Sequence, residues 1–87
     1  MLELYQAEGC HHSQTVREKL TELGLTYVVH NPRLPGNAGG DVLNEFTHDE
    51  LRKRGGEDRI PFLVDTRRGT ALYESEAIVE YLEEHYA

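Results

Sequence analysis

The sequence is poor in several residue types, and each shortage limits what the chain can do. Its 87 residues include one cysteine and no tryptophan. A single cysteine excludes an intramolecular disulfide and a zinc site built from several cysteines, so the redox or metal chemistry of one copy is limited to one sulfur. No apolar run approaches the length that spans a bilayer, and the first residues lack a secretory signal. We therefore expect a soluble, cytoplasmic protein whose thiol stays reduced.

Basic residues are also scarce. The nine lysines and arginines are outnumbered by 16 aspartates and glutamates, which gives a formal net charge of -7. Nucleic acids and anionic membranes bind to basic surfaces, so we expect neither as a partner. The chain has no internal repeat or low-complexity tract, and its length fits one domain over residues 1–87.

What the sequence does contain is an alternation of strand and helix patterns. The apolar residues Val16, Leu20 and Leu23 recur at helical spacing before Gly24, and they predict an amphipathic helix. Strand patterns on either side of this helix predict a parallel pair, and a tight turn at Arg67-Arg68-Gly69 predicts an antiparallel hairpin. The predicted elements are strands over 2–6, 26–30, 60–65 and 70–73, and helices over 13–23, 47–54 and from 75 onward.

Two of the predicted helices begin with capping signals. Thr47 and Glu50 have the spacing of a capping box, and Ser75 is a typical N-cap residue.

Between the second strand and the second helix lies a long segment, residues 31–46, that is rich in proline, glycine and asparagine. Segments of this kind are either functional or mobile.

The only cysteine stands where the first strand passes into the first helix, in the run Cys10-His11-His12-Ser13. The unpaired amides and the dipole of a helix N-terminus stabilise a thiolate, so we expect a lowered thiol pKa and a functional role for Cys10. A protonated His11 or His12 near the sulfur would add to this effect, whereas the carboxylate of Glu8 would oppose it. Adjacent residues rarely supply several ligands to one metal ion, so we expect no metal site here.

Two blocks of the sequence resemble glutaredoxins and the N-terminal domain of glutathione S-transferases. The first runs from Leu4 to Gly24 and holds the cysteine, and the second runs from Ile60 to Leu82 and holds the pairs Ile60-Pro61 and Glu74-Ser75. Together they cover nearly the whole chain except residues 31–46. The resemblance implies an α/β, thioredoxin-like fold of the glutaredoxin type, in the order βαβ-α-ββα, in which a four-stranded mixed sheet carries helices on both faces.

The resemblance also implies a binding site for glutathione or a similar small thiol peptide. In this family the proline at the position of Pro61 is cis and presents the backbone of Ile60 to the ligand as an added strand. Glu74 and Ser75 match the pair that holds the γ-glutamyl end of the ligand. Arg33 is a candidate for the ligand's terminal carboxylate. The residues alone leave open that Pro61 only starts a strand and that Ser75 is only a cap.

The same resemblance implies a reaction. Dithiol members of the family carry a second cysteine at the position of Ser13, so the serine implies a monothiol (C-x-x-S) thiol-disulfide oxidoreductase. Cys10 would take up the small thiol from a mixed disulfide of a protein substrate, and a second small thiol would regenerate it, with Ser13 as a hydrogen-bond donor to the thiolate. No tightly bound cofactor is expected. Full glutathione transferase activity is not expected either, because no helical domain follows the last predicted helix.

Two alternatives stay open. In monothiol glutaredoxins, two subunits and two thiol peptides hold a [2Fe-2S] cluster, and one cysteine per chain is compatible with such a dimer. Cys10 would then be a cluster ligand and the protein an iron-sulfur carrier; without a cluster we expect a monomer. The second alternative is a non-catalytic module that binds a thiol peptide or a partner protein.

Overall fold

The computed structural model describes residues 1–87, and its strands and helices follow the order that the sequence predicts. None of its helices is long and apolar enough to cross a membrane. The elements are β1 (Leu2–Tyr5), α1 (His11–Glu22), β2 (Tyr27–His30), α2 (Glu45–Gly55), β3 (Phe62–Asp65), β4 (Thr70–Tyr73) and α3 (Ser75–Tyr86).

The four strands form one mixed sheet in the order β2-β1-β3-β4. β1 is parallel to β2, with Leu2 opposite Tyr27, because α1 carries the chain back along the sheet between them. β3 is antiparallel to β1, with Tyr5 opposite Phe62, and the turn after β3 pairs it with β4. The predicted thioredoxin-like fold is therefore confirmed, with β1 and β3 as its central strands.

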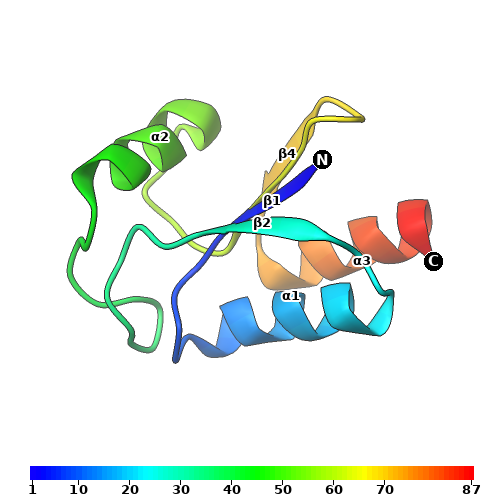
Figure 1. Ribbon diagram of the computed structural model, residues 1–87, viewed down its shortest axis with the longest axis horizontal. Coiled ribbons are helices and arrows are strands. Elements are labelled where there is room, and N and C mark those ends of the chain that lie inside the picture. Colours follow the sequence, from blue (N-terminus) through cyan, green and yellow to red (C-terminus); the bar gives the residue numbers. More distant parts are fainter.

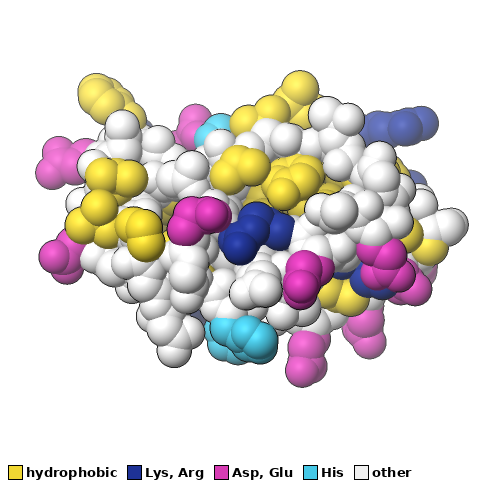
Figure 2. Space-filling view, turned by 60° about the horizontal axis from the view of Figure 1, so that its bottom comes forward, with side chains coloured by type: hydrophobic (Ala, Val, Ile, Leu, Met, Phe, Trp, Pro, Cys, Tyr) yellow, Lys and Arg dark blue, Asp and Glu magenta, His cyan; other side chains and the backbone are white.

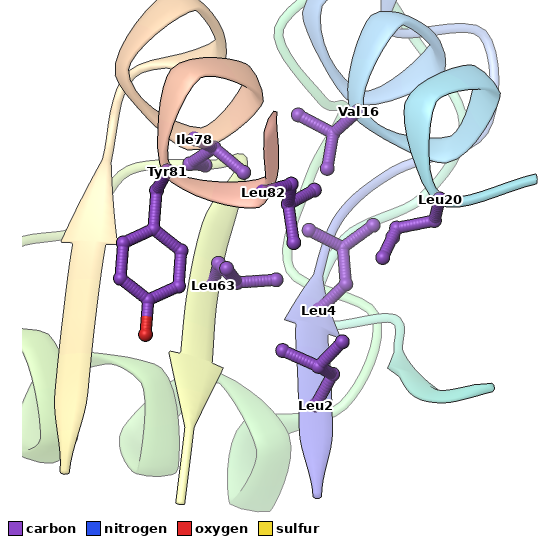
Figure 3. Close-up of a cluster of buried hydrophobic side chains, with 8 residues drawn as sticks. All are labelled: Leu2, Leu4, Val16, Leu20, Leu63, Ile78, Tyr81 and Leu82. Atoms are coloured by element: carbon purple, nitrogen blue, oxygen red, sulfur yellow. The ribbon is translucent and has the colours of Figure 1, made fainter. Parts of the chain in front are cut away.

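One face of the sheet is covered by α1 and α3, which lie side by side (Figure 1). Side chains of both helices meet those of the two central strands between the layers (Figure 3). Burying one large aliphatic side chain stabilises a fold by roughly 1.5–3 kcal/mol. This cluster is the larger of two buried clusters, and it fixes α1 and thereby the position of Cys10. It consists of Leu2, Leu4, Val16, Leu20, Leu63, Ile78, Tyr81 and Leu82.

The opposite face is covered by α2 (Figure 1). A smaller cluster lies under this helix and is made of Tyr5, Leu51, Phe62 and Val64. The Tyr5 ring stacks on the ring of His30 in β2, with 4.3 Å between their centroids. The predicted placement of helices on both faces of the sheet is thereby confirmed.

A charged network ties α2 to this face of the sheet. Glu3 in β1 accepts two hydrogen bonds from Arg54 of α2, at 2.9 and 3.0 Å, and its Oε1 lies 2.8 Å from Nε2 of His30. The Glu3 side chain is only 13% exposed. The hydrogen bonds from Arg54 outweigh the opposing effect of burial and, together with His30, lower the pKa of Glu3 to about 2. One charged carboxylate therefore joins three elements of the fold.

Two helices begin differently from the sequence prediction at the ends that face the candidate site. α1 begins at His11 rather than Ser13, so Cys10 itself is the N-cap residue. α3 has Glu74 as its N-cap, and the predicted cap Ser75 is instead its first helical residue. The prediction for Ser75 is wrong because the carbonyl of Glu74 already accepts a hydrogen bond of the first helical turn, at 2.9 Å.

The start of α2 also differs from the prediction. The helix begins at Glu45, because the side chain of Asn44 accepts a hydrogen bond from the amide of Thr47 at 3.1 Å. The predicted capping box of Thr47 and Glu50 is therefore wrong. Glu50 instead accepts a hydrogen bond from the hydroxyl of Tyr5, so it helps to hold α2 against the sheet.

Candidate functional site

Cys10 stands at the start of α1, after the short turn that follows β1. Its carbonyl accepts a hydrogen bond from the amide of Gln14 at 3.0 Å. Its backbone is extended, with φ -89° and ψ 117°. The residue thus flanks the first turn of the helix, whose amides have no intrahelical acceptor. The thiol lies at a helix N-terminus, where the sequence analysis expected it.

Ser13 lies in the first turn of α1 and is fully buried. Its hydroxyl oxygen accepts a hydrogen bond from the amide of Ala7 at 3.3 Å. The hydroxyl also lies close enough to the sulfur of Cys10 to lower the pKa of the thiol. Ser13 therefore connects the turn before the helix to the thiol.

A flap follows β2, and we define it as residues 32–43. Its two sides are joined by an antiparallel bridge between Arg33 and Val42 and by further backbone hydrogen bonds. Its tip, residues 35–40, lies beside the turn from β1 into α1 (Figure 1). Hydrophobic side chains gather on the surface at this end of the molecule (Figure 2), and the exposed ones from the flap and the start of α2 are Leu34, Val42, Leu43 and Phe46.

The tip of the flap covers the thiol. The amide of Gly36 donates to the carbonyl of Glu8 at 2.9 Å. A Cβ placed on Gly9 would lie 3.4 Å from the nitrogen of Gly36, so the two backbone segments are in contact. Ala38 has a left-handed φ of 66°, and its amide lies close enough to the sulfur of Cys10 to lower the pKa of the thiol. As a result, Cys10 is 0% exposed.

The surroundings of the sulfur favour its ionised form. Burial raises the pKa of the Cys10 thiol, and this is the largest single effect. The hydroxyl of Ser13 and the amides of Ser13, Ala38 and His12 act in the opposite direction, because each is a donor to a thiolate. Together they hold the pKa of Cys10 below its ordinary value. The cysteine thus has the electrostatic surroundings of a reactive thiol while the flap shields it from solvent.

The side chains of His11, His12 and Glu8 are placed away from this set of donors. Both histidines are exposed, and 6.1 Å separates their ring centroids. The Glu8 carboxylate is 65% exposed and lies 3.4 Å from the guanidinium of Arg17. Of these three residues, only His12 is among the strongest influences on Cys10, and it acts through its backbone amide.

The segment before β3 brings unpaired backbone groups to the flap. The peptide bond between Ile60 and Pro61 is cis, and Pro61 is buried. Neither the amide nor the carbonyl of Ile60 takes part in a backbone–backbone hydrogen bond. A Cβ placed on Gly39 would lie 3.2 Å from Cδ1 of Ile60. Ile60 therefore packs against the same flap tip that covers Cys10.

A pocket of about 500 Å³ at the N-terminus of α3 joins Glu74 and Ser75 to His12. The left-handed φ of Glu74, 74°, costs a residue other than glycine about 1–3 kcal/mol. Its carboxylate forms an ion pair with Arg59. Cys10 is buried and does not line this pocket, so the pocket at Glu74 and Ser75 does not reach the thiol. The other lining residues are Glu76, Ala77 and Glu80.

The guanidinium of Arg33 is occupied within the protein. It donates to both carboxylate oxygens of Asp58, at 2.8 and 2.9 Å, and to the carbonyl of Gly40 at 2.9 Å. Nε2 of His48 lies 2.9 Å from the same carboxylate. The hydrogen bonds from Arg33 outweigh burial and, together with His48, hold the pKa of Asp58 below its ordinary value. Arg33 therefore links the flap to the segment before β3.

Comparison with known proteins identifies the family of this chain. A family model described as the N-terminal domain of glutathione S-transferase matches residues 4–87. The chain belongs to the glutathione S-transferase N-terminal domain family. A search of curated proteins finds no significant match to the domain.

Solved structures of several transferases resemble this glutathione S-transferase domain. A diazinon-metabolizing glutathione S-transferase of the silkworm Bombyx mori is 25% identical with a TM-score of 0.73, over 99% of this chain and 38% of that one. The glutathione transferase URE2P6 of Phanerochaete chrysosporium is 30% identical with a TM-score of 0.71. The match covers 98% of this chain and 36% of URE2P6. A delta-class transferase of Nilaparvata lugens shares the fold with a TM-score of 0.77 and is 24% identical. The match covers 100% of this chain and 37% of that transferase. The chain thus spans 36% to 38% of these relatives.

The domain has no group of three or more histidine, cysteine, aspartate or glutamate side chains arranged to hold a metal ion. A shared [2Fe-2S] cluster needs a thiolate that reaches both iron and a second subunit. In this structure the sulfur of Cys10 is covered by the flap tip and faces the amide of Ala38. With the flap in this position, the Cys10 sulfur cannot reach an iron atom shared with a second subunit, so the residues around the thiol do not fit a [2Fe-2S] cluster.

Sequence reasoning missed three residues at the site of this transferase-family domain. Ala38 supplies an amide to the sulfur, Asp58 holds the flap, and Arg59 pairs with Glu74. Ala38 acts through its backbone, so no side-chain signal reveals it. Arg59 directly precedes Ile60-Pro61, and a cation beside an expected ligand segment is the signal that could have found it.

Proposed function

We propose that this domain binds glutathione or a similar small thiol peptide and transfers the small thiol out of mixed disulfides through Cys10. The observation that carries the proposal is the set of donors around the sulfur, in which the Ser13 hydroxyl and three backbone amides favour a thiolate. Two similar proteins support the choice of ligand. URE2P6 is known in complex with oxidized glutathione, and a transferase homologue of Drosophila mojavensis is known with bound glutathione.

The proposed ligand would extend from the thiol to the start of α3. Its cysteinyl part would pair with the unoccupied amide and carbonyl of Ile60, as an added strand. Its α-carboxylate would bind the Ser75 hydroxyl and the first amides of α3, where the helix dipole favours an anion. Its ammonium would bind Glu74 and displace Arg59 from that carboxylate. If Arg33 receives the terminal carboxylate, its pairing with Asp58 must open first.

The proposed reaction uses one protein thiol. The Cys10 thiolate attacks the small-thiol sulfur of a mixed disulfide, so a disulfide forms between Cys10 and the small thiol, and the substrate sulfur leaves as a thiolate that takes a proton from water. A second small thiol, as its thiolate, then attacks the same small-thiol sulfur. The oxidised dimer of the small thiol leaves, and Cys10 is again a thiolate. Ser13 has no sulfur, so it cannot resolve the intermediate by an internal disulfide.

A second candidate function is favoured by the burial of the thiol. Cys10 is 0% exposed, and a protein that only binds a thiol peptide needs no access to the sulfur. A non-catalytic binding module is therefore the alternative to the oxidoreductase. The two functions differ in whether Cys10 forms a covalent adduct with the small thiol.

A single-turnover experiment separates these functions. Reduced protein is mixed with a glutathionylated peptide in the absence of free glutathione. We expect intact-mass spectrometry to show one glutathionyl group on Cys10, together with an equal amount of released peptide thiol. Added glutathione should then restore the free protein thiol. Glutathione binding without any adduct would overturn the oxidoreductase in favour of the binding module, and visible absorbance after anaerobic reconstitution with iron and sulfide would favour the iron-sulfur carrier.

The backbone of Glu74 gives a further prediction. In Glu74→Gly the left-handed conformation is no longer strained, so we expect the free energy of unfolding to rise by about 1 kcal/mol. The affinity for glutathione should fall several-fold, because the ligand's ammonium loses its carboxylate. Urea unfolding and titration calorimetry measure the two effects. The matched control is Glu76→Gly, in the first turn of α3, which should lose about 1 kcal/mol of stability. A less stable Glu74→Gly protein would contradict the strain argument.

A further inference from the structure

The proposed reaction needs a sulfur that reaches a substrate, but Cys10 is fully buried. The tip of the flap provides the cover. One backbone hydrogen bond, from the amide of Gly36 to the carbonyl of Glu8, joins this tip to the turn before α1. The tip is also bonded within itself, because the amide of Gly39 donates to the carbonyl of Gly36 at 2.9 Å. The cover is thus a compact unit with little attachment to the turn below it.

The flap is fastened on its other side by Arg33. This guanidinium donates both to the carbonyl of Gly40, at the end of the tip, and to Asp58, in the segment before β3. The side chains of Arg33 and Asp58 are 22% and 41% exposed, so water reaches the pair. His48, from α2, is the third member of the group. The position of the tip therefore depends on a partly exposed ion pair.

We propose that the flap is a gate over Cys10, and that Arg33 and Asp58 are positioning residues that hold it closed. This inference rests on the proposed function, because it concerns access to the same thiol. In the closed state the amide of Ala38 faces the sulfur and no reagent reaches it. In the open state the pairing of Arg33 with Asp58 is broken, the tip leaves Glu8, and the sulfur becomes accessible.

The gate predicts a change in access to the thiol. Opening exposes the sulfur, so its reaction with a small reagent becomes faster. The effects of opening on the thiol pKa oppose each other, because the loss of the Ala38 amide raises the pKa and the relief of burial lowers it. The rate on the high-pH plateau, where the thiol is fully ionised, therefore reports access alone.

The other ionisable side chains beside this end of α1 are Glu8, which pairs with Arg17, and the exposed His11 and His12. From the start of α3, Glu74, which pairs with Arg59, and the carboxylates of Glu76 and Glu80 share a pocket with His12. All of these side chains are unchanged in the variants below.

The test is the rate of Cys10 alkylation by iodoacetamide across a series of pH values. Asp58→Asn should react about three- to tenfold faster than the wild type on the high-pH plateau, where the thiol is fully ionised in both proteins. Hydrogen exchange at the Gly36 amide should accelerate by a similar factor, while exchange at the core amide of Leu63 stays the same. The matched control is Glu57→Gln, which removes a neighbouring carboxylate whose partner is Arg59, and it should behave as the wild type.

A second variant acts on the tip itself. Gly39→Ala would place a Cβ 2.8 Å from Cδ of Arg33 and 3.2 Å from Cδ1 of Ile60, so it should displace the tip and also speed alkylation. Its matched control is Gly69→Ala in the turn after β3, which introduces the same left-handed strain with nothing within 4 Å of the new Cβ, so it should react as the wild type. Unchanged alkylation in Asp58→Asn and Gly39→Ala would overturn the gate, and so would an acceleration matched by equally faster exchange at Leu63. None of these measurements needs a disulfide substrate, so the gate and the transfer reaction are tested separately.

Discussion

Cys10→Ser is expected to slow the release of glutathione from a mixed disulfide by more than about 1,000-fold, because it removes the only nucleophilic sulfur of the chain. A serine hydroxyl does not ionise near neutral pH and forms no disulfide. The binding of glutathione should persist, since Ile60, Glu74 and Ser75 are unchanged. The measurement is the initial rate of peptide-thiol release, with titration calorimetry for binding. An active Cys10→Ser protein would contradict the assignment of the thiol as the nucleophile.

Ser13→Ala provides the comparison for this variant. It removes the hydroxyl donor but leaves the three amides that face the sulfur, so we expect transfer within about tenfold of the wild type at high pH. Because the thiol pKa rises, the loss should grow as the pH falls. Stability should drop by about 1–3 kcal/mol, since the buried amide of Ala7 loses its acceptor.

The control for Ser13→Ala is a half-buried residue of the same helix. Thr15→Ala removes a hydroxyl that bonds only to the carbonyl of His11, at 3.1 Å, and it should leave the pH profile and the stability nearly unchanged. If Ser13→Ala were as inactive as Cys10→Ser at every pH, Ser13 would be more than a hydrogen-bond donor. The monothiol route would then need revision.

The fold was predictable because its signals are local. The spacing of Val16 and Leu20 determines which face of α1 meets the sheet, and both are fully buried as that spacing requires. Helix starts were predicted less well. Asn44 rather than Thr47 caps α2, and the two residue types favour this position for the same reason. Whether Asn44 or Thr47 is the cap depends on where the preceding flap ends. The spacing of residues in the sequence does not show where that is.

The site was predictable only where side chains carry chemistry. Cys10 was found because a thiol at a helix start has a physical consequence that can be read from the sequence. The contribution of Ala38 was hidden, since it depends on a backbone amide and a left-handed φ. Arg33 was noticed as a cation, but its partner Asp58 lies 25 residues away in the sequence. Only the tertiary fold shows that these two residues act on the flap.

Glu3→Gln is expected to cause the largest loss of stability among the variants of the charged network. The pKa of Glu3 is lowered from its ordinary value of 4.5 to about 2 by Arg54, against burial and with the help of His30. A shift of this size corresponds to about 3 kcal/mol of stability at neutral pH. Glutamine keeps the shape of the side chain but gives up the charge, and it leaves Arg54 without a counter-ion. Urea unfolding at pH 7 measures the effect.

The pH dependence gives this prediction its sharper test. Because the folded pKa of Glu3 lies below the unfolded one, its contribution is fully present above pH 4.5 and is lost as the pH falls from 4.5 to about 2. The unfolding free energies of wild type and Glu3→Gln should therefore converge over this interval. The control Glu22→Gln removes a 65% exposed partner of Lys19 and should cost less than about 0.5 kcal/mol at any pH. A difference between wild type and Glu3→Gln that stays constant down to pH 2 would mean that packing, rather than charge, accounts for the role of Glu3.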